Sequence, residues 1–211
     1  MVDPAGAASP KVVALMGSYH RDGTIAQLVE RALEGARAAG AETETIVLID
    51  QHVEFCLNCR HCAAQPGETR GPCVQHDDVD ALLDRLVEAD AVVLAAPVNI
   101  GDVNALTRQF LERMLGFYDW PEEAPAPKLR RELSRSERRP ALLITSSAAP
   151  SLLTRLFASP LKTLRTMAKL LGTRPVGELV CGLAGRPGQG PGARDLERAE
   201  HLGRRLAQRV H

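Results

Sequence analysis

Four of the five cysteines in this 211-residue chain lie in one short segment, EFCLNCRHCAAQPGETRGPC (54–73). Cys56, Cys59 and Cys62 recur at every third position, and Cys73 follows after a gap rich in Gly, Pro and polar residues. Four thiolates are the ligand set of a [4Fe–4S] cluster, and a loop supplies them more easily than a helix. They are equally a structural zinc set, although zinc sites more often pair two distant C-x₂-C units. The spacing leaves an iron–sulfur cluster, zinc, a redox disulfide and free thiols open.

The segment GSYHRDGT (17–24) has the composition of an anion-binding turn that leads into a helix. Gly17 permits a tight turn, Gly23 lets the backbone approach an anion, and the helix N-terminus supplies unpaired N–H groups. The spacing is neither G-x-G-x-x-G nor the Walker pattern, and a simple capped turn is the alternative. The candidate binding positions are Ser18, His20, Arg21, Gly23, Thr24 and Ile25.

Two further loops with few bulky side chains follow apolar runs, at 96–101 and 146–149. In the first, Pro97 and Gly101 bracket a short loop against which a flat ring could lie, using backbone N–H groups. Because ligands of open α/β sheets bind beyond the carboxyl ends of the strands, we expect the three loops to form one shallow site. The candidate ring-binding positions are Pro97, Val98, Asn99, Ile100, Gly101, Ser146, Ser147, Ala148 and Ala149.

Apolar runs and amphipathic stretches alternate along the chain, and this pattern positions the three loops. The runs predict strands over 11–18, 43–50, 91–99, 141–147 and 176–185. The amphipathic stretches predict helices over 24–41, 77–90, 103–116, 151–172 (with a break near Pro160) and 193–210. Five apolar strands alternating with helices specify an α/β fold, a parallel sheet covered by helices on both faces.

Length and charge limit the classes of function. We expect one domain over 1–211, with a cysteine-rich loop at 51–76 and a polar surface excursion at 121–140. Lys+Arg and Asp+Glu number 26 each, so the basic surplus that nucleic acid or an anionic membrane requires is missing. No run is apolar enough to span a bilayer, and the first ten residues do not look like a signal peptide. We therefore expect a cytoplasmic protein, in which clustered cysteines are more often metal-binding or redox-active than structural disulfides.

The motifs ALMGSYHRDGTIAQLVERAL (14–33) and ADAVVLAAPVNIGDVNALTRQFLER (89–113), with the cysteines between them, resemble the flavodoxin-like NAD(P)H-dependent FMN reductases. The branch they resemble most includes the iron–sulfur flavoproteins. The resemblance covers about 11–185 and implies a doubly wound five-stranded sheet of order 2-1-3-4-5 with FMN at the switch point. It implies that Ser18, Arg21, Gly23 and Thr24 hold the FMN phosphate. Residues 97–101 would line the isoalloxazine ring, and 146–149 would form the third loop.

The resemblance also favours one reading of the cysteines. The iron–sulfur flavoproteins carry C-x₂-C-x₂-C and then a fourth cysteine, so a [4Fe–4S] cluster on Cys56, Cys59, Cys62 and Cys73 is favoured over zinc. The gap before Cys73 is longer than in the compact form of that motif. Since the second strand would lie beside the first, we expect such a cluster close to the flavin. His61 and His76 are interpreted as solvated loop residues, and Cys181 as a core residue.

The chain departs from the family at both FMN loops. Tyr19 and His20 stand where the first loop commonly has Pro-Arg, and the hydroxyl of Thr24 is displaced by one position. The third-strand loop usually has an aromatic residue where Asn99 stands, so stacking on the flavin from that position is lost. Tyr19 or Trp120 is the candidate replacement.

The resemblance predicts an oxidoreductase in which FMN takes hydride from NAD(P)H and passes electrons to a flavin, a quinone or a metal centre as the acceptor. No catalytic acid or base is predicted, because Asp77 and Asp78 are interpreted as charges at a helix N-terminus. One alternative is an iron–sulfur flavoprotein that carries electrons without a nicotinamide substrate, although carriers of that fold tend to be acidic and this chain is neutral. A zinc-stabilised binding module without enzymatic activity is the other.

The resemblance further implies a homodimer or homotetramer, because flavin sites of the family are often completed by a second subunit. Three of the chain's seven aromatic residues, Phe117, Tyr118 and Trp120, lie close together. Such a group suits a subunit contact, since interfaces favour aromatic anchors. A cluster in the core at a helix end is the alternative.

Overall fold

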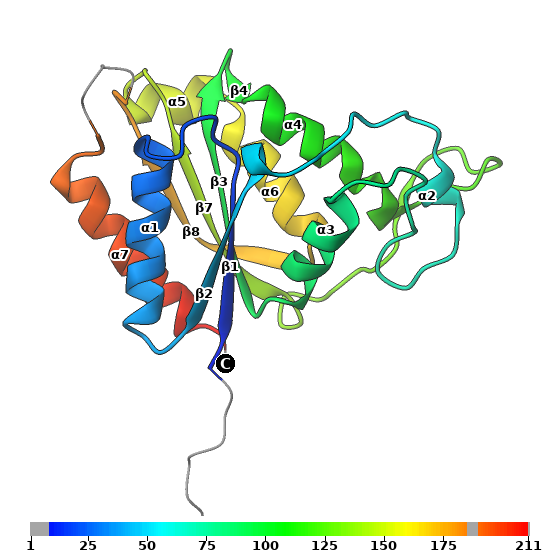
Figure 1. Cartoon of the computed structure of the whole chain (residues 1–211), viewed down its shortest axis with the longest axis horizontal. Helices are drawn as coiled ribbons and strands as arrows, with labels where there is room; N and C mark the ends of the chain where they lie inside the picture. The colour runs from blue at the N-terminus through cyan, green and yellow to red at the C-terminus, as the bar shows by residue number, and fades with distance from the viewer. Residues whose placement is uncertain (1–8, 185–189, 211) are drawn as a thin grey trace, which may run out of the picture.

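Five parallel strands form the central sheet of the computed structural model, which describes residues 9–184 and 190–210 (Figure 1). Their order is β2-β1-β3-β7-β8, and this order confirms the predicted doubly wound, flavodoxin-like fold. The strands are β1 (Lys11–Met16), β2 (Glu42–Val47), β3 (Ala91–Asn99), β7 (Arg139–Ser146) and β8 (Thr173–Cys181).

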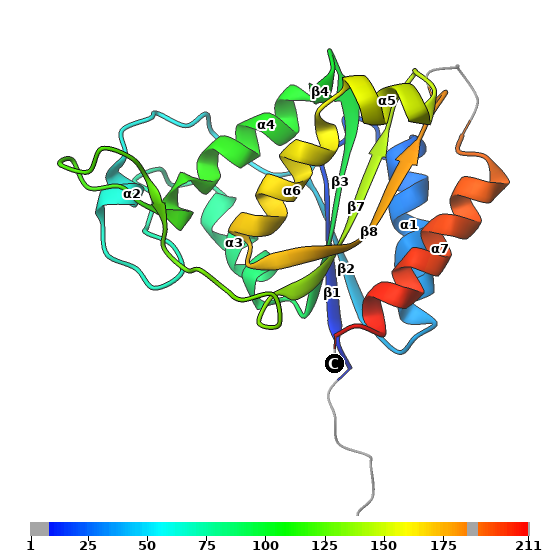
Figure 2. The ribbon, with the colours of Figure 1, turned by 180° about the vertical axis from the view of Figure 1, so that it is seen from behind.

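Helices cover both faces of this sheet (Figures 1 and 2). On one face lie α1 (Thr24–Arg37) and α7 (Ala193–Ala207), whose apolar residues share a core with alternate residues of the strands. On the other lie α3 (Val79–Glu88), α4 (Ala105–Glu112) and α6 (Pro160–Leu170). Because the central strands are buried on both faces, Ala91 to Ala96 are all apolar and at most 2% exposed.

Most predicted elements are present, with shifted ends. The helix predicted over 151–172 breaks before Pro160, as expected, into α5 (Ser151–Phe157) and α6. The helix predicted from 103 begins at Ala105, because Asp102–Val103 form the short strand β4, antiparallel to the end of β3. The predicted end of the fifth strand, 185, lies outside the described residues.

Five short elements complete the described chain. These are η1 (Leu48–Asp50), α2 (His61–Ala64), η2 (Arg113–Phe117), β5 (Tyr118–Asp119) and β6 (Lys128–Leu129). Two of them, η1 and η2, replace the ends of the strand predicted over 43–50 and of the helix predicted over 103–116. No helix within 9–184 or 190–210 is both long and apolar enough to cross a membrane.

The segment predicted as a polar surface excursion, 121–140, is only partly one. Most of its side chains are exposed, but β6 pairs with β5, and Arg130 makes contacts with the cysteine loop. The neighbouring aromatic residues belong to this packed region. Phe117 is buried in the core and Tyr118 packs against it, while the Trp120 ring lies under the Arg60 guanidinium. Phe117 and Tyr118 thus belong to the core, whereas Trp120 packs on the cysteine loop.

Candidate functional site

The register of the sheet places the three predicted loops side by side. Met16 pairs with Ala95, Pro97 with Ser146, and Ser146 with Cys181. The strands β1, β3 and β7 are neighbours and parallel, so their carboxyl ends lie on one edge. The segments 17–23, 97–101 and 146–150 therefore meet at that edge, as the sequence predicted.

The first loop presents the N-terminus of α1 to this edge. Gly23 is the N-cap of α1, and no side chain caps the helix there. The Ser18 side chain is buried beside it, and its Oγ accepts a hydrogen bond of 3.1 Å from the His20 amide. The first turn of a 14-residue helix thus keeps free amides and the positive end of its dipole, which is an anion-binding arrangement.

Of the two basic residues of this loop, Arg21 already has a charged partner. Arg21 is exposed and forms an ion pair with Asp50, and this hydrogen bond and charge raise the pKa of Arg21. His20 is exposed and packs near Gly23, where an added Cβ would lie 3.1 Å from the His20 Cβ. An anion that used Arg21 would have to compete with Asp50.

A buried asparagine that the sequence reasoning missed holds the first loop against α4. Asn104 is the N-cap of α4; its Oδ1 accepts from the Thr107 amide at 3.1 Å, and its Nδ2 donates to the Gly17 carbonyl at 2.7 Å. A Cβ on Gly17 would lie 2.0 Å from Thr107 Oγ1. Gly17 is therefore required for the close approach of this loop to α4. An Asn just before a helical segment, where it can cap the N-terminus, was the available signal for this role.

The second loop is a tight hairpin, and most of its predicted residues are in the strand. Pro97, Val98 and Asn99 complete β3, and Asn99 pairs with Asp102. The two turn residues, Ile100 and Gly101, have φ of 48° and 81°. A two-residue hairpin requires positive φ at both positions, which suits Gly101. Ile100 is branched at Cβ, so this conformation is strained, and its side chain is fully exposed.

The third loop is small and is joined to the end of β8. Ser146 and Ser147 are buried, and Ser147 Oγ accepts from the Ala149 amide at 3.1 Å. The Ser147 amide donates to Cys181 and the Leu183 amide donates to Ala149. Ala148 is exposed and has only a methyl side chain. The loop is thus fixed in place and leaves its outer surface free of large side chains.

Tyr19 and Trp120 were the candidates for stacking on a flat ring. Tyr19 lies at the loops, where its hydroxyl accepts a 3.2 Å hydrogen bond from the Leu106 amide. Trp120 lies at the cysteine loop, because its amide donates to Ala63 and its ring contacts Arg60. Trp120 is therefore excluded by position, and Tyr19 is retained.

The cysteine loop lies at the far end of α4 and not beside the three loops (Figures 1 and 2). After η1, the chain runs along α4: Gln109 donates to Val53 at 2.5 Å, and Arg113 donates to Glu54 at 2.9 Å. Asn104 and Arg113 are nine positions apart, so this places the cysteine loop about 14 Å along the helix axis from the first loop. The expectation that the cysteines lie close to the ring site is wrong for a single chain.

The segment between Cys62 and Cys73 packs closely against neighbouring backbone, and this packing brings Cys73 back toward the other cysteines. The Gly71 amide donates to the Gly116 carbonyl at 2.9 Å, and a Cβ on Gly71 would lie 1.9 Å from the Cys62 carbonyl oxygen. Arg130 closes this region: its guanidinium donates to the carbonyls of Cys62, Ala63, Gln65 and Gly116. The gap that weakened the sequence motif is therefore folded into a compact loop.

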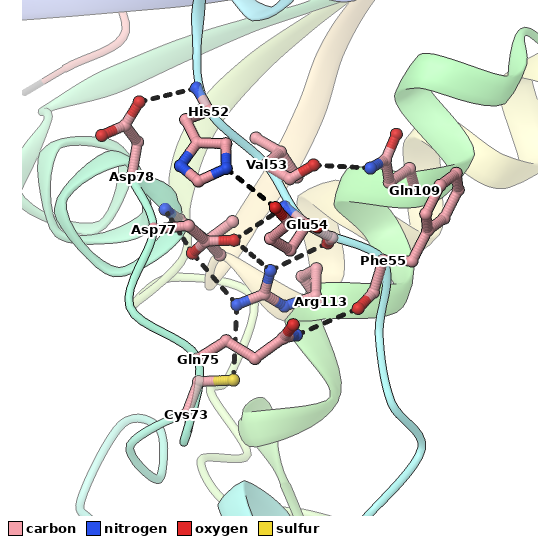
Figure 3. Close-up of polar contacts among 11 residues, drawn as sticks. His52, Val53, Glu54, Phe55, Cys73, Gln75, Asp77, Asp78, Gln109 and Arg113 are labelled. Atoms are coloured by element: carbon pink, nitrogen blue, oxygen red, sulfur yellow. Dashed lines mark hydrogen bonds and ion pairs between the residues drawn. The ribbon is translucent and has the colours of Figure 1, made fainter.

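The two ends of the cysteine loop are bonded to each other and to Arg113 (Figure 3). Asp77 Oδ2 accepts from the Glu54 amide at 2.8 Å, Asp78 Oδ2 accepts from the His52 amide at 2.7 Å, and Gln75 donates to Phe55 at 3.0 Å. Arg113 forms an ion pair with Asp77, and both side chains are 1% exposed. Its Nη2 donates to Cys73 Sγ at 3.3 Å.

The pKa values of two ionisable groups in this region are shifted. Burial by itself raises the pKa of Asp77, but hydrogen bonds from Arg113 and from the amides of Glu54 and Val79 lower it overall. Asp77 therefore does more than the predicted helix-terminal charge, although it does accept from Val79 at the start of α3. Burial raises the pKa of Cys62, and the charges of Cys73, Cys56 and Cys59 raise it further.

The four thiols are the kind of ligand that a metal cluster requires, but they are not already arranged as a metal site. Across 9–184 and 190–210, no group of three or more His, Cys, Asp or Glu side chains has the arrangement of a metal site. Asn58 and Arg60, between the cysteines, have φ of 51° and 59°, so the loop turns sharply after each of the first two. All four are free thiols, and Cys59 is exposed. Cys181, by contrast, is buried in β8, and burial raises its pKa to about 12.

The sheet order, the uncapped α1 and the small loops at one edge are those of a flavodoxin-like α/β protein. Comparison with known proteins agrees: residues 10–156 match the model of the NADPH-dependent FMN reductase family. The chain belongs to that family.

Curated relatives are named for an iron–sulfur centre. An iron–sulfur flavoprotein of Archaeoglobus fulgidus is 34% identical over 107 residues, 51% of this chain and 46% of the relative. One from Methanocaldococcus jannaschii is 35% identical over 103 residues, 49% of this chain and 51% of the relative. The match thus spans about half the length of these relatives.

Solved structures share the fold at low identity. NAD(P)H:quinone oxidoreductase from Methanothermobacter marburgensis has a TM-score of 0.64 at 19% identity, with 94% of this chain and 98% of that chain covered. An FMN-dependent NADH-azoreductase from Bacillus anthracis, solved with FMN, has a TM-score of 0.64 at 13% identity, with 96% and 99% covered.

The strained hairpin gives a test of stability. Replacing Ile100 with Asn removes a β-branched residue from the left-handed region without removing any packing. We expect Ile100→Asn to raise the free energy of unfolding by about 1 kcal/mol in urea titrations of FMN-free protein. Leu156→Asn, at an exposed apolar position in α5 without positive φ, is the control and should give no gain. A lower stability for Ile100→Asn would show that the turn is unstrained.

Proposed function

We propose that this chain is an FMN-dependent oxidoreductase that takes hydride from NAD(P)H and passes electrons to a flavin, a quinone or a metal centre. The observation that carries the proposal is the meeting of three small loops with the uncapped N-terminus of α1 at one edge of the sheet. Family membership supports FMN as the cofactor. The NAD(P)H:quinone oxidoreductase fold of a structural neighbour is consistent with a nicotinamide donor.

The phosphate of FMN would bind at the first loop. Ser18 Oγ already accepts a hydrogen bond from the His20 amide. Its own proton has no acceptor among the described contacts, so it is available to a phosphate oxygen. The amides of the first turn of α1, beginning at Thr24 and Ile25, would supply further donors. His20 and Arg21 contribute positive character at most, since Arg21 is paired with Asp50.

The ring would lie across the other two loops. Pro97 to Gly101 offer a strand end and a tight turn, and Ser146 to Ala149 offer small side chains and backbone groups. When bound, FMN supplies a ring that accepts hydride from a reduced nicotinamide. The protein therefore needs to orient two rings and exclude water, and we assign it no catalytic acid or base.

The cysteine loop would hold a [4Fe–4S] cluster on Cys56, Cys59, Cys62 and Cys73. The names of the curated relatives support iron over zinc, and four thiolates are the ligand set of such a cluster. A cluster at this loop would add one-electron chemistry to the two-electron chemistry of the ring. An electron carrier without a nicotinamide substrate is the second candidate, since the relatives are named only for their flavin and iron–sulfur centre.

We propose that residues 1–211 act as one FMN-binding domain within a homodimer or homotetramer. One continuous sheet through the described residues supports a single domain. Exposed apolar side chains gather around the second and third loops, on the hairpin tip, on α5 and after β8, and a second copy of the chain suits this surface. They are Ile100, Leu152, Leu153, Leu156, Phe157 and Leu183.

The FMN site is tested by Ser18→Ala, which removes one charge-assisted hydrogen bond. We expect the Kd for FMN to rise by about tenfold or more in a fluorescence titration, because such bonds contribute about 1.5–3 kcal/mol. Ser136→Ala, in the polar excursion, is the matched control and should bind FMN normally. Anaerobic NADPH or NADH should then bleach the flavin absorption of the wild-type protein. Equal FMN affinity in the two variants would remove the first loop from the site, and resistance to both nicotinamides would favour the electron carrier.

The metal loop is tested by Cys59→Ser, which removes an exposed thiol. After reconstitution with iron and sulfide, we expect iron per chain to fall toward background while FMN affinity stays unchanged, because the FMN loops arise from other strands. Cys181→Ser, in the buried part of β8, should retain the iron content of the wild type. Wild-type protein with only background iron would exclude the cluster, and a zinc content near one per chain would favour zinc instead.

The assembly is tested by Phe157→Asp, which places a charge in the exposed apolar surface. We expect sedimentation equilibrium to show a smaller species than the wild type at the same concentration, since burial of an unpaired carboxylate opposes association. Ser136→Asp is the control with the same added charge outside that surface. A wild-type protein that is monomeric with full flavin occupancy would contradict the proposed oligomer.

A further inference from the structure

The most deeply buried ion pair in the described chain lies at the cysteine loop. The side chains of Arg113 and Asp77 are each 1% exposed, whereas every other ion pair found has at least one partner with more than a fifth of its side chain exposed. A buried guanidinium is costly unless each N–H has an acceptor and its charge is balanced. The contacts of Arg113 therefore show what this part of the fold is built around.

All four terminal N–H groups of Arg113 have acceptors (Figure 3). Nη1 donates to the Glu54 carbonyl at 2.9 Å and to Asp77 Oδ2. Nη2 donates to Asp77 Oδ1 at 3.1 Å and to Cys73 Sγ at 3.3 Å. Since the guanidinium is planar and three of its bonds are fixed by Asp77 and the backbone, the fourth N–H is aimed at the sulfur of Cys73.

The charge of Asp77 is itself held by other donors. The amides of Glu54 and Val79 donate to its carboxylate at 2.8 Å and 3.2 Å. Asp77 therefore shares its negative charge between Arg113 and two backbone dipoles. Asp77 therefore neutralises the positive charge of Arg113 only in part, and the Cys73 sulfur lies next to the remainder.

We propose that Arg113 is a positioning residue that holds the Cys73 sulfur and raises the reduction potential of a cluster bound there, with Asp77 setting the strength of this effect. The inference rests on the proposed [4Fe–4S] loop. A hydrogen bond and a positive charge next to a ligating sulfur stabilise the reduced cluster, which carries one more negative charge. Asp77 lowers that stabilisation because it neutralises part of the arginine charge.

This role predicts shifts of opposite sign from the two members of one ion pair. The double variant Arg113→Met with Asp77→Asn removes the donor and both charges, so the cluster becomes harder to reduce and its potential falls. Asp77→Asn alone keeps an amide oxygen as an acceptor for Arg113 but leaves the arginine charge unopposed, so the potential rises at a cost in stability. A purely structural role for the pair would not give shifts of opposite sign. A tenfold change in the reduction equilibrium of a one-electron couple is 59 mV.

The double variant also guards against misfolding. Arg113→Met alone would leave Asp77 as an unpaired buried charge and strongly destabilise the fold. Replacing both members with uncharged side chains costs less, because no buried charge is left unpaired. Circular dichroism and FMN titration of each variant check that the fold is intact before its potential is measured.

Arg130 supplies the matched control. It holds the same loop through the carbonyls of Cys62, Ala63 and Gln65, and none of its described contacts is to a sulfur. Arg130→Lys keeps the charge and weakens this clamp. We expect it to lower the iron content per chain without moving the potential of the cluster that remains.

The experiment is an anaerobic redox titration of the reconstituted full chain, followed by electron paramagnetic resonance. We expect about a tenfold shift in the reduction equilibrium, negative for the double variant, positive for Asp77→Asn, and none for Arg130→Lys. A wild-type cluster with variants that share its potential would overturn this inference and leave the proposed function intact. Wild-type protein that takes up no iron, or only zinc, would overturn the proposed cluster and the inference together.

Discussion

The buried charge of Arg113 is the constraint on which the cysteine region depends. A guanidinium removed from water needs acceptors for its N–H groups, and here they come from two segments of the chain, one with Glu54 and one with Cys73 and Asp77. Those residues flank the cysteine loop on both sides. Satisfying one arginine therefore closes the base of the loop, and the loop cannot move without leaving a buried charge unpaired.

One helical segment connects this region to the proposed flavin edge. Asn104, at its start, bonds to the carbonyl of Gly17, and Arg113, nine positions later, bonds to Cys73. Both candidate sites are thus fixed to the same rigid element, and their separation is set by helix rise. The hydrogen bonds of Asn104 at the start of α4 and of Arg113 at its end determine where the two sites lie relative to the sheet.

The flavin edge combines free polar groups with local strain. The uncapped α1 leaves amides without partners, and Ile100 holds a conformation that a β-branched residue adopts only at a cost. Neither feature stabilises the isolated chain. Features of this kind collect at binding surfaces, because a ligand or a second subunit supplies the compensating contacts. The proposed second subunit would cover the exposed apolar residues of α5 and the hairpin.

Local sequence pattern determined the sheet and the three loops. Short apolar runs such as 91–96 favour a buried strand, and Gly17, Gly23 and Gly101 mark the turns that follow, so the order of elements and the edge where the three loops meet were predictable. Periodicity carries no information about which distant residues meet. The sequence therefore predicted Asp77 as a helix-terminal charge, the segment 121–140 as a surface excursion, and the cysteines as neighbours of the flavin. Only the tertiary structure paired Asp77 with Arg113 and brought Arg130 onto the cysteine loop. These partners lie far apart along the chain, and burial of their charges in a common interior selects them.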